Sequence, residues 1–239
     1  MTKAEILVQL QREILPLQGF KPALHSTALD QCLGSIRNAF PNQTFPLGAL
    51  HEFVSDSNEA AAAASGFIGA LVSSLLQNEG MILWIPGAQP IYPPALKGFG
   101  LSPEKIIFLN NICEKEILWA MEEALRCTGL TAVVGEIPHL DFTTSRRLQL
   151  SVEQSKVTGF ITRNHVKNPG TTATLTRWRI LPLPSEPVDG LPGVGFPRWQ
   201  VDLLKVRNGR PGSWQLEWAE GAFRLVDVRG EEEGRRKRA

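Results

Sequence analysis

The stretch that decides the fold runs from Ala49 to Gln77 and reads ALHEFVSDSNEAAAAASGFIGALVSSLLQ. Residues 49–54 form a short, mostly apolar run of strand length, which predicts a buried strand. The alanine-rich run from Glu59 to Gln77 carries large apolar side chains at helical spacing and predicts a helix. A strand that leads directly into a helix is the repeating unit of an α/β fold.

Strands and helices alternate on the C-terminal side of this stretch. Further strands are predicted at 81–85, 105–109, 130–134 and 157–162. Two further helices are predicted, one at 113–127 capped by Asn110 or Asn111, and one that begins at a Thr144 or Ser145 cap and ends near Lys156. Nearly continuous apolar strands of this kind, separated by helices, indicate a doubly wound, mostly parallel sheet covered on both faces.

The pattern changes beyond residue 173, where apolar and polar residues alternate more strictly. The segments concerned are 174–181, 200–206, 214–218 and 223–228. Strong turn signals, Asn208-Gly209 and Pro211-Gly212, separate two of them. We therefore expect antiparallel strands at the C-terminal end of the sheet.

The chain divides into four parts. Residues 1–18 have one apolar helical face and predict an amphipathic helix that packs on its own chain or docks on a partner. Residues 19–47 are expected to be a loop-rich connecting segment, and residues 48–228 the core with its antiparallel extension. Residues 229–239, rich in charge and poor in apolar side chains, predict a disordered tail.

Composition excludes several classes of protein. The formal net charge is +1, so a strongly electrostatic nucleic-acid binder is not expected. The N-terminus carries acids and glutamines within its apolar pattern, unlike a signal peptide, and no apolar run approaches the roughly 20 residues that span a bilayer. Three cysteines are too few for a disulfide framework and lack metal-ligand spacing, which indicates reduced thiols in the cytoplasm, with Cys113 and Cys127 facing the core.

The loop between the first strand and its helix has the position of a phosphate-binding loop without its chemistry. The eight residues concerned are Ser55, Asp56, Ser57, Asn58, Glu59, Ala60, Ala61 and Ala62. No glycine, lysine or arginine lies among them, so neither the backbone nest nor the cation that holds a triphosphate can form. Asp56 and Glu59 would repel phosphate, and Ser57 or Asn58 is expected to cap the helix.

Other candidate catalytic positions agree with this interpretation. Glu136, after the strand 130–134, has no lysine partner in the pattern and is expected to be a solvated residue at a strand end. The four histidines are scattered, and no nucleophile elbow occurs. The sequence therefore predicts no enzymatic activity, no cofactor and no metal.

Nine cations are candidates for contacts with DNA or a partner. They are Arg146, Arg147, Arg163, Lys167, Arg177, Arg179, Arg198, Lys205 and Arg207. Alternation places Arg177 and Arg179 on one face of their strand and Trp178 on the other. Two interpretations remain open, a basic aromatic binding patch and a core tryptophan beside exposed arginines.

Several longer segments are similar to the ImuA family, which is RecA-like. They are FPLGALHEF, LWAMEEALRC, SRRLQLSVEQS and LLKVRNGRPGSWQLEW, and the likeness extends over nearly the whole chain. The resemblance implies a RecA-like fold with a degenerate phosphate loop, in which Ala61 and Ala62 replace the Lys and Thr of RecA-type ATPases. It also implies that the loop 163–170 corresponds to a DNA-contacting loop of RecA-like proteins.

The resemblance further implies a bacterial, SOS-induced function in error-prone translesion DNA synthesis. The implied partners are an ImuB-type inactive Y-family polymerase-like protein and an error-prone replicative-type polymerase, with RecA and weakly bound DNA as further contacts and no membrane. The alternative is a SulA-like division inhibitor that binds the tubulin-like division protein.

Overall fold

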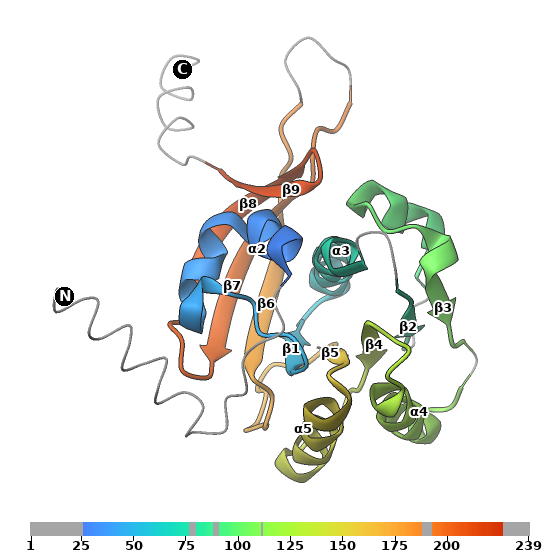
Figure 1. Cartoon of the computed structure of the whole chain (residues 1–239). Coiled ribbons are helices and arrows are strands. Elements are labelled where there is room, and N and C mark those ends of the chain that lie inside the picture. The colour runs from blue at the N-terminus through green and yellow to red at the C-terminus, as the bar shows by residue number, and fades with distance from the viewer. Residues whose placement is uncertain (1–25, 77–79, 88–90, 111, 188–192, 227–239) are drawn as a thin grey trace, which may run out of the picture.

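The computed structural model describes residues 26–76, 80–87, 91–110, 112–187 and 193–226 (Figure 1). The predicted helix at 1–18 and the predicted tail at 229–239 lie outside the described residues.

A single mixed sheet forms the centre of the molecule. Among the described residues it has nine strands in the order β3-β2-β4-β5-β1-β6-β7-β8-β9. The strands are β1 (Leu50–Val54), β2 (Ile82–Ile85), β3 (Ile106–Phe108), β4 (Ala132–Glu136), β5 (Thr158–Arg163), β6 (Thr176–Leu183), β7 (Arg198–Val206), β8 (Gly212–Ala219) and β9 (Ala222–Leu225). The six strands β3, β2, β4, β5, β1 and β6 pair in parallel, and β6, β7, β8 and β9 pair antiparallel. This confirms the predicted mostly parallel α/β sheet with antiparallel C-terminal strands.

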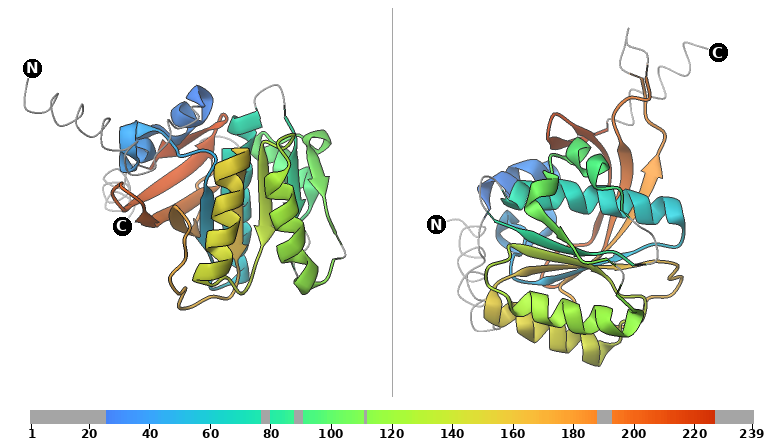
Figure 2. Two further views of the ribbon diagram at one scale, coloured as in Figure 1. Left: turned by 60° about the horizontal axis from the view of Figure 1, so that its bottom comes forward. Right: turned by 90° about the vertical axis from the view of Figure 1, so that its right-hand side faces the viewer.

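Helices cover both faces of the parallel part. Helix α3 (Asn58–Leu76) lies on one face, and α4 (Glu114–Arg126) and α5 (Phe142–Ser155) lie side by side on the other, as the right-hand view of Figure 2 shows. The face with α3 also carries α2 (Thr27–Leu33), whose buried residues share one core cluster with those of α3. The short 3₁₀ helices are η1 (Gly34–Ala39), η2 (Pro41–Gln43), η3 (Pro93–Phe99) and η4 (Pro103–Lys105).

The expectation of a loop-rich segment at 19–47 was wrong for its described part. Helix α2 and the turns η1 and η2 form a second layer on the sheet, with Leu29, Leu33 and Ile36 almost fully buried. Leu29, Cys32, Leu33 and Ile36 follow the i, i+3, i+4, i+7 spacing of a helical face, a signal that the prediction overlooked. Their burial comes from contact with α3 and β9, which follow much later in the sequence.

The predicted helix caps also need correction. Asp141 caps α5, because its carboxylate accepts the backbone N–H of Thr144 at 2.7 Å, so the helix begins one turn before the predicted cap. Cys113 caps α4, and Glu116 accepts the Cys113 N–H at 3.0 Å. Cys113 and Cys127 flank the two ends of α4 and are both exposed, which corrects the expectation that they face the core. They are exposed because they lie beyond the apolar stripe of the helix.

Helix α3 is the apolar centre of the fold. With 19 residues it is long and apolar enough by length and composition to cross a membrane, which corrects the statement that no run approaches that length. Most of it is buried against the sheet, as expected of a core helix. Phe67 lies at its middle, with ring centroids 4.8 Å from Phe223, 5.9 Å from Trp178 and 6.0 Å from Trp199. The antiparallel extension is thus packed on the same helix as the parallel strands.

A buried histidine links β1 to β6 beneath this aromatic layer. His51 is fully buried between the rings of Phe45 and Phe160, at centroid distances of 4.4 and 5.4 Å. Its Nε2 donates to the carbonyl of Pro46 at 2.9 Å, and its Nδ1 accepts the hydroxyl of Thr176 at 2.8 Å. Burial lowers the pKa of His51 to about 3, so the ring is neutral at physiological pH.

This histidine makes stability depend on pH. In the unfolded chain a histidine takes up a proton as the pH falls below 6.5, whereas the folded protein keeps His51 neutral until about pH 3. The free energy of unfolding should therefore fall by about 2 kcal/mol more between pH 7 and pH 5 in the wild type than in His51→Gln. Urea denaturation of the wild type and of His51→Gln at pH 7 and pH 5 measures this difference in the free energy of unfolding. The exposed His139 provides the control, since His139→Gln should keep the wild-type dependence. An equal loss in wild type and His51→Gln would contradict the assignment.

Candidate functional site

Side chains at the junction of β1 and α3 accept hydrogen bonds from the backbone N–H groups that are left free at the start of the helix. The hydroxyl of Ser57 accepts the backbone N–H of Ala60 at 3.2 Å, which confirms one of the two predicted caps. The pKa of Glu59 lies below its usual value because its own backbone N–H and the Ser57 hydroxyl stabilise the carboxylate. Asp56 is exposed beside them. The positive end of the α3 dipole is therefore occupied by groups of the chain itself.

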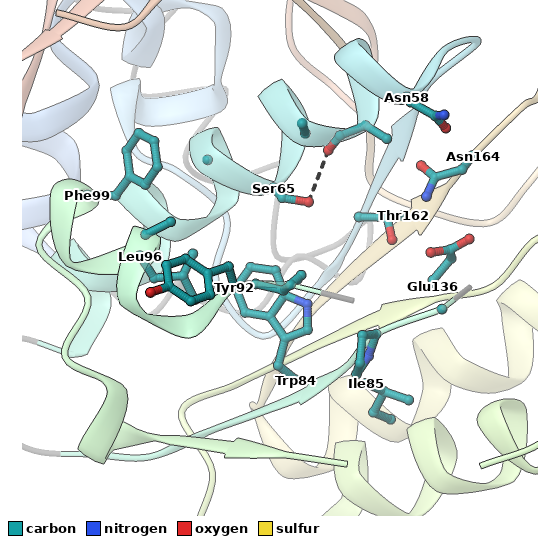
Figure 3. A pocket seen from close by; sticks show the side chains of 17 residues that line it. Asn58, Ser65, Trp84, Ile85, Tyr92, Leu96, Phe99, Glu136, Thr162 and Asn164 are labelled. Atoms are coloured by element: carbon teal, nitrogen blue, oxygen red, sulfur yellow. Dashed lines mark hydrogen bonds between the residues drawn. The ribbon is translucent and has the colours of Figure 1, made fainter. Parts of the chain in front are cut away.

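A pocket of about 230 Å³ lies directly beside this helix start, at the carboxyl ends of β2, β4 and β5 (Figure 3). This edge of a parallel sheet is where α/β proteins usually bind ligands. Ala61 and Ala62, near the start of α3, line the pocket together with Ser65 one turn later. The hydroxyl of Ser65 donates back to the Ala61 carbonyl at 3.0 Å.

The pocket has a polar end and an aromatic end. Figure 3 shows the polar side chains of Asn58, Glu136, Thr162 and Asn164 together on one side. The opposite side carries Tyr92, Leu96 and Phe99, and Trp84 lies between the two ends.

Glu136 belongs to the wall of this pocket, which corrects its interpretation as a solvated strand-end residue. Burial raises the pKa of its carboxyl, and the Asn164 amide and the Gly87 N–H oppose that shift. Gly87 leaves the room that this carboxylate needs, because a Cβ at that position would lie 2.1 Å from the Glu136 carboxyl group. The site therefore contains the half-buried carboxylate of Glu136, which fits because Gly87, just after β2, has no side chain.

Sequence reasoning missed the remaining walls of the pocket. Trp84 lies on β2, Tyr92 and Phe99 belong to η3 and its N-cap, and Asn164 follows β5. The side chains of these three segments meet through the parallel pairing of β2, β4 and β5. The one signal available was the dipeptide Pro86-Gly87 directly after β2. Among the described residues, no group of three or more His, Cys, Asp or Glu side chains could hold a metal ion.

Several predicted contact residues are instead engaged inside the protein. Glu52 on β1 is fully buried, and its carboxylate pairs with Arg163 of β5 at 2.7 Å and Arg177 of β6 at 2.9 Å. Thr172 and Thr174 donate to the same carboxylate at 2.7 and 3.1 Å. Burial alone would raise the pKa of Glu52, but these hydrogen bonds and the arginine charges outweigh it and lower the pKa.

Two further cations extend this network. Lys205 donates to the carbonyl of Thr172 at 2.7 Å, and Arg207 approaches the carbonyl of Ala173 at 3.5 Å. Burial, together with the Arg177 charge, lowers the pKa of Lys205. The structure thus brings Arg163, Arg177, Lys205 and Arg207 together around Glu52 and the irregular segment 172–174 that directly precedes β6.

The other candidate cations lie apart from this cluster. Arg146 and Arg147 lie in the second turn of α5, not at its start, and pair with Glu153 and Glu122. Arg179 pairs with Asp202, and Arg198 pairs with Glu186 and Glu217 at the far end of β7. Lys167 is exposed in the loop after β5. Trp178 is fully buried, as the interpretation with a core tryptophan expects. Arg179 is exposed, but Arg177 is largely buried, which differs from the expected pair of exposed arginines.

Comparison with known proteins gives two groups of relatives. No family model matches the chain. The ImuA proteins of two Caulobacter vibrioides strains are each 35% identical to it, over 84% of this chain and 92% of their own length. The cell division inhibitor SulA of Yersinia pestis is 29% identical over 48% of this chain and 68% of its own length.

We expect Mg-ATP to leave the thermal unfolding temperature unchanged. The region Ser55–Ala62 offers phosphate no basic side chain, and its helix start is already capped. A site with a Kd of about 1 µM would add about 4 kcal/mol of stability at 1 mM ATP, so differential scanning fluorimetry has ample range. Sodium triphosphate at matched ionic strength is the control for salt effects. A saturable rise of the unfolding temperature with ATP alone would contradict this expectation.

The buried ion pairs also predict a clear contrast between two arginines on one strand. Arg177→Met should lower the free energy of unfolding by about 3–5 kcal/mol, because it leaves the buried Glu52 carboxylate with one cation fewer. Arg179→Met should cost less than about 1 kcal/mol, because its pair with Asp202 is largely solvated. Urea denaturation of both variants at pH 7 compares them, and equal stability of the two would refute the structural role of Arg177.

Proposed function

Because the chain belongs to the ImuA family, we propose that it is a non-catalytic accessory protein of SOS-induced mutagenesis. In this role it binds other proteins of the error-prone DNA synthesis machinery and carries out no reaction of its own.

The observation that carries the proposal is the extent of the likeness to the Caulobacter ImuA proteins. It covers 84% of this chain and 92% of theirs, so it extends over most of the length of both proteins. The likeness to SulA covers less than half of this chain, which leaves division inhibition as the weaker alternative.

We further infer that the fold is RecA-like and that its phosphate loop is degenerate. The order of the strands, with β1 between β5 and β6 and α3 directly after β1, supports this inference. So does the pocket at the start of α3, where Ala61 and Ala62 offer methyl groups to a space that an ATPase would fill with phosphate. Without these contacts, binding rather than hydrolysis is the function that the site can serve.

The partners that we propose are an ImuB-type inactive Y-family polymerase-like protein and an error-prone replicative-type polymerase, in the bacterial cytoplasm. RecA is a further candidate. Direct DNA binding is expected to be weak, because four of the nine candidate cations serve the buried network around Glu52 or the carbonyls beside it.

Affinity purification from DNA-damaged cells tests this function. The tagged chain should recover the polymerase-like partner, identified by mass spectrometry, in damaged cells at a level well above that in undamaged cells. Arg179→Met and Arg177→Met should be purified in parallel, so that a loss caused by misfolding is recognised. Recovery of the tubulin-like division protein in place of the polymerase-like partner would reject the proposal in favour of a SulA-like inhibitor.

A further inference from the structure

The polar end of the pocket is rich in hydrogen-bond acceptors, and His165 is near enough to its carboxylate to lower the pKa of Glu136 against the effect of burial. Glu136 makes no ion pair within the described part of the chain, although its carboxylate is half-buried. The Oδ1 atom of Asn164 is buried and has no hydrogen-bond partner. Buried acceptors without partners are uncommon and call for an explanation, such as a ligand that donates to them. Glu136 and Asn164 both line the same pocket.

The rest of the pocket is aromatic and apolar. Trp84, Tyr92 and Phe99 line it, and Tyr92 is 71% exposed at the surface. Aromatic faces attract cations and stack against the plane of a guanidinium group. An acceptor-rich end joined to an aromatic channel therefore suits a ligand with an apolar stem and a cationic head.

The size of the pocket and the charges around it narrow the range of possible ligands further. A volume of about 230 Å³ is below the range of roughly 300–1,000 Å³ that is usual for small-molecule sites, and it suits a single long side chain. Phosphate and nucleic acid are disfavoured, because Glu136 lies in the pocket and Asp56 and Glu59 lie at the start of α3 beside it.

From this geometry we propose that the pocket binds an arginine side chain presented by a protein partner. The guanidinium donates to the Glu136 carboxylate and to Asn164 Oδ1, and the stem of the side chain passes along Trp84 and Tyr92. A planar group with five donors can satisfy two neighbouring acceptors at once, which an ammonium group does less well. The inference rests on the proposed function, because it names the feature by which a partner would be recognised.

The first test uses N-acetyl-arginine-methylamide as the probe, titrated into the ¹⁵N-labelled protein and followed by NMR. Saturable shifts of pocket amides, among them Gly87 and Asn164, are expected with a Kd of about 1–10 mM. Glu136→Gln should weaken binding at least about tenfold, because a charge-assisted hydrogen bond is lost. Glu123→Gln, a half-exposed acid on α4, is the matched control and should bind as the wild type does.

Two outcomes of this titration would overturn the proposal. One is equal binding of N-acetyl-norleucine-methylamide, which has a similar stem without donors. The other is displacement of the arginine probe by Mg-ATP at the same ionic strength, which would make the pocket a nucleotide site.

The second test separates this inference from the proposed function. Glu136→Gln and Glu123→Gln are tagged and purified from DNA-damaged cells beside the wild type. If the wild type recovers the polymerase-like partner and Glu136→Gln recovers several-fold less, the pocket contributes to recognition. If both recover it equally, the accessory function stands and the arginine site is refuted as its basis. If even the wild type recovers no such partner, the proposed function itself fails, and the arginine proposal fails with it as a recognition feature.

Discussion

The buried carboxylate of Glu52 is the constraint on which much of this fold depends. It lies at the middle of β1 and faces the α5 side of the sheet, where Arg163 of β5 and Arg177 of β6 reach it from the two neighbouring strands. A buried charge of this kind is tolerated only when several partners compensate its lost hydration. The requirement ties the parallel strand on one side of β1 to the strand on the other side that begins the antiparallel extension. It also brings Arg177 and Lys205 opposite one another across β6 and β7, a pairing of like charges that the central carboxylate makes acceptable.

The secondary structure was predictable because it depends on local patterns. Apolar runs gave the strands, with β4 and β6 each displaced by two residues, and helical spacing gave α3, α4 and α5. The roles of the cations were not predictable in the same way, because Glu52 is more than 100 residues from both of its arginines. From sequence alone Arg177 resembles a surface contact residue, and only the pairing of β1 with β6 shows otherwise. The helical spacing of α2 was present in the sequence and was overlooked, but its place on the sheet could not be predicted, since its burial depends on β9 at the other end of the described chain.

The candidate site also has a part that depends on consecutive residues and a part that depends on residues far apart in the sequence. The loop 55–57 and the cap of α3 by Ser57 follow from consecutive residues, so they could be anticipated. The pocket beside the loop could not, because its walls come from the ends of three parallel strands and from η3. Glu136 was judged on its neighbours in sequence and taken as solvated, whereas its surroundings are set by Gly87, which lies on the adjacent strand end and has no side chain to exclude it.

These local choices reverse the electrostatic character that this position has in a nucleotide-binding protein. There, free backbone N–H groups and a lysine make the start of the helix a site for anions. Here Ser57 and Glu59 already engage those N–H groups, Ala61 and Ala62 line the space beside them, and an acid enters from β4. Each change favours donors and cations over phosphate. Empty space costs stability, so a pocket without a use would be expected to fill with larger side chains. An open, acceptor-lined pocket at this position therefore favours a binding role.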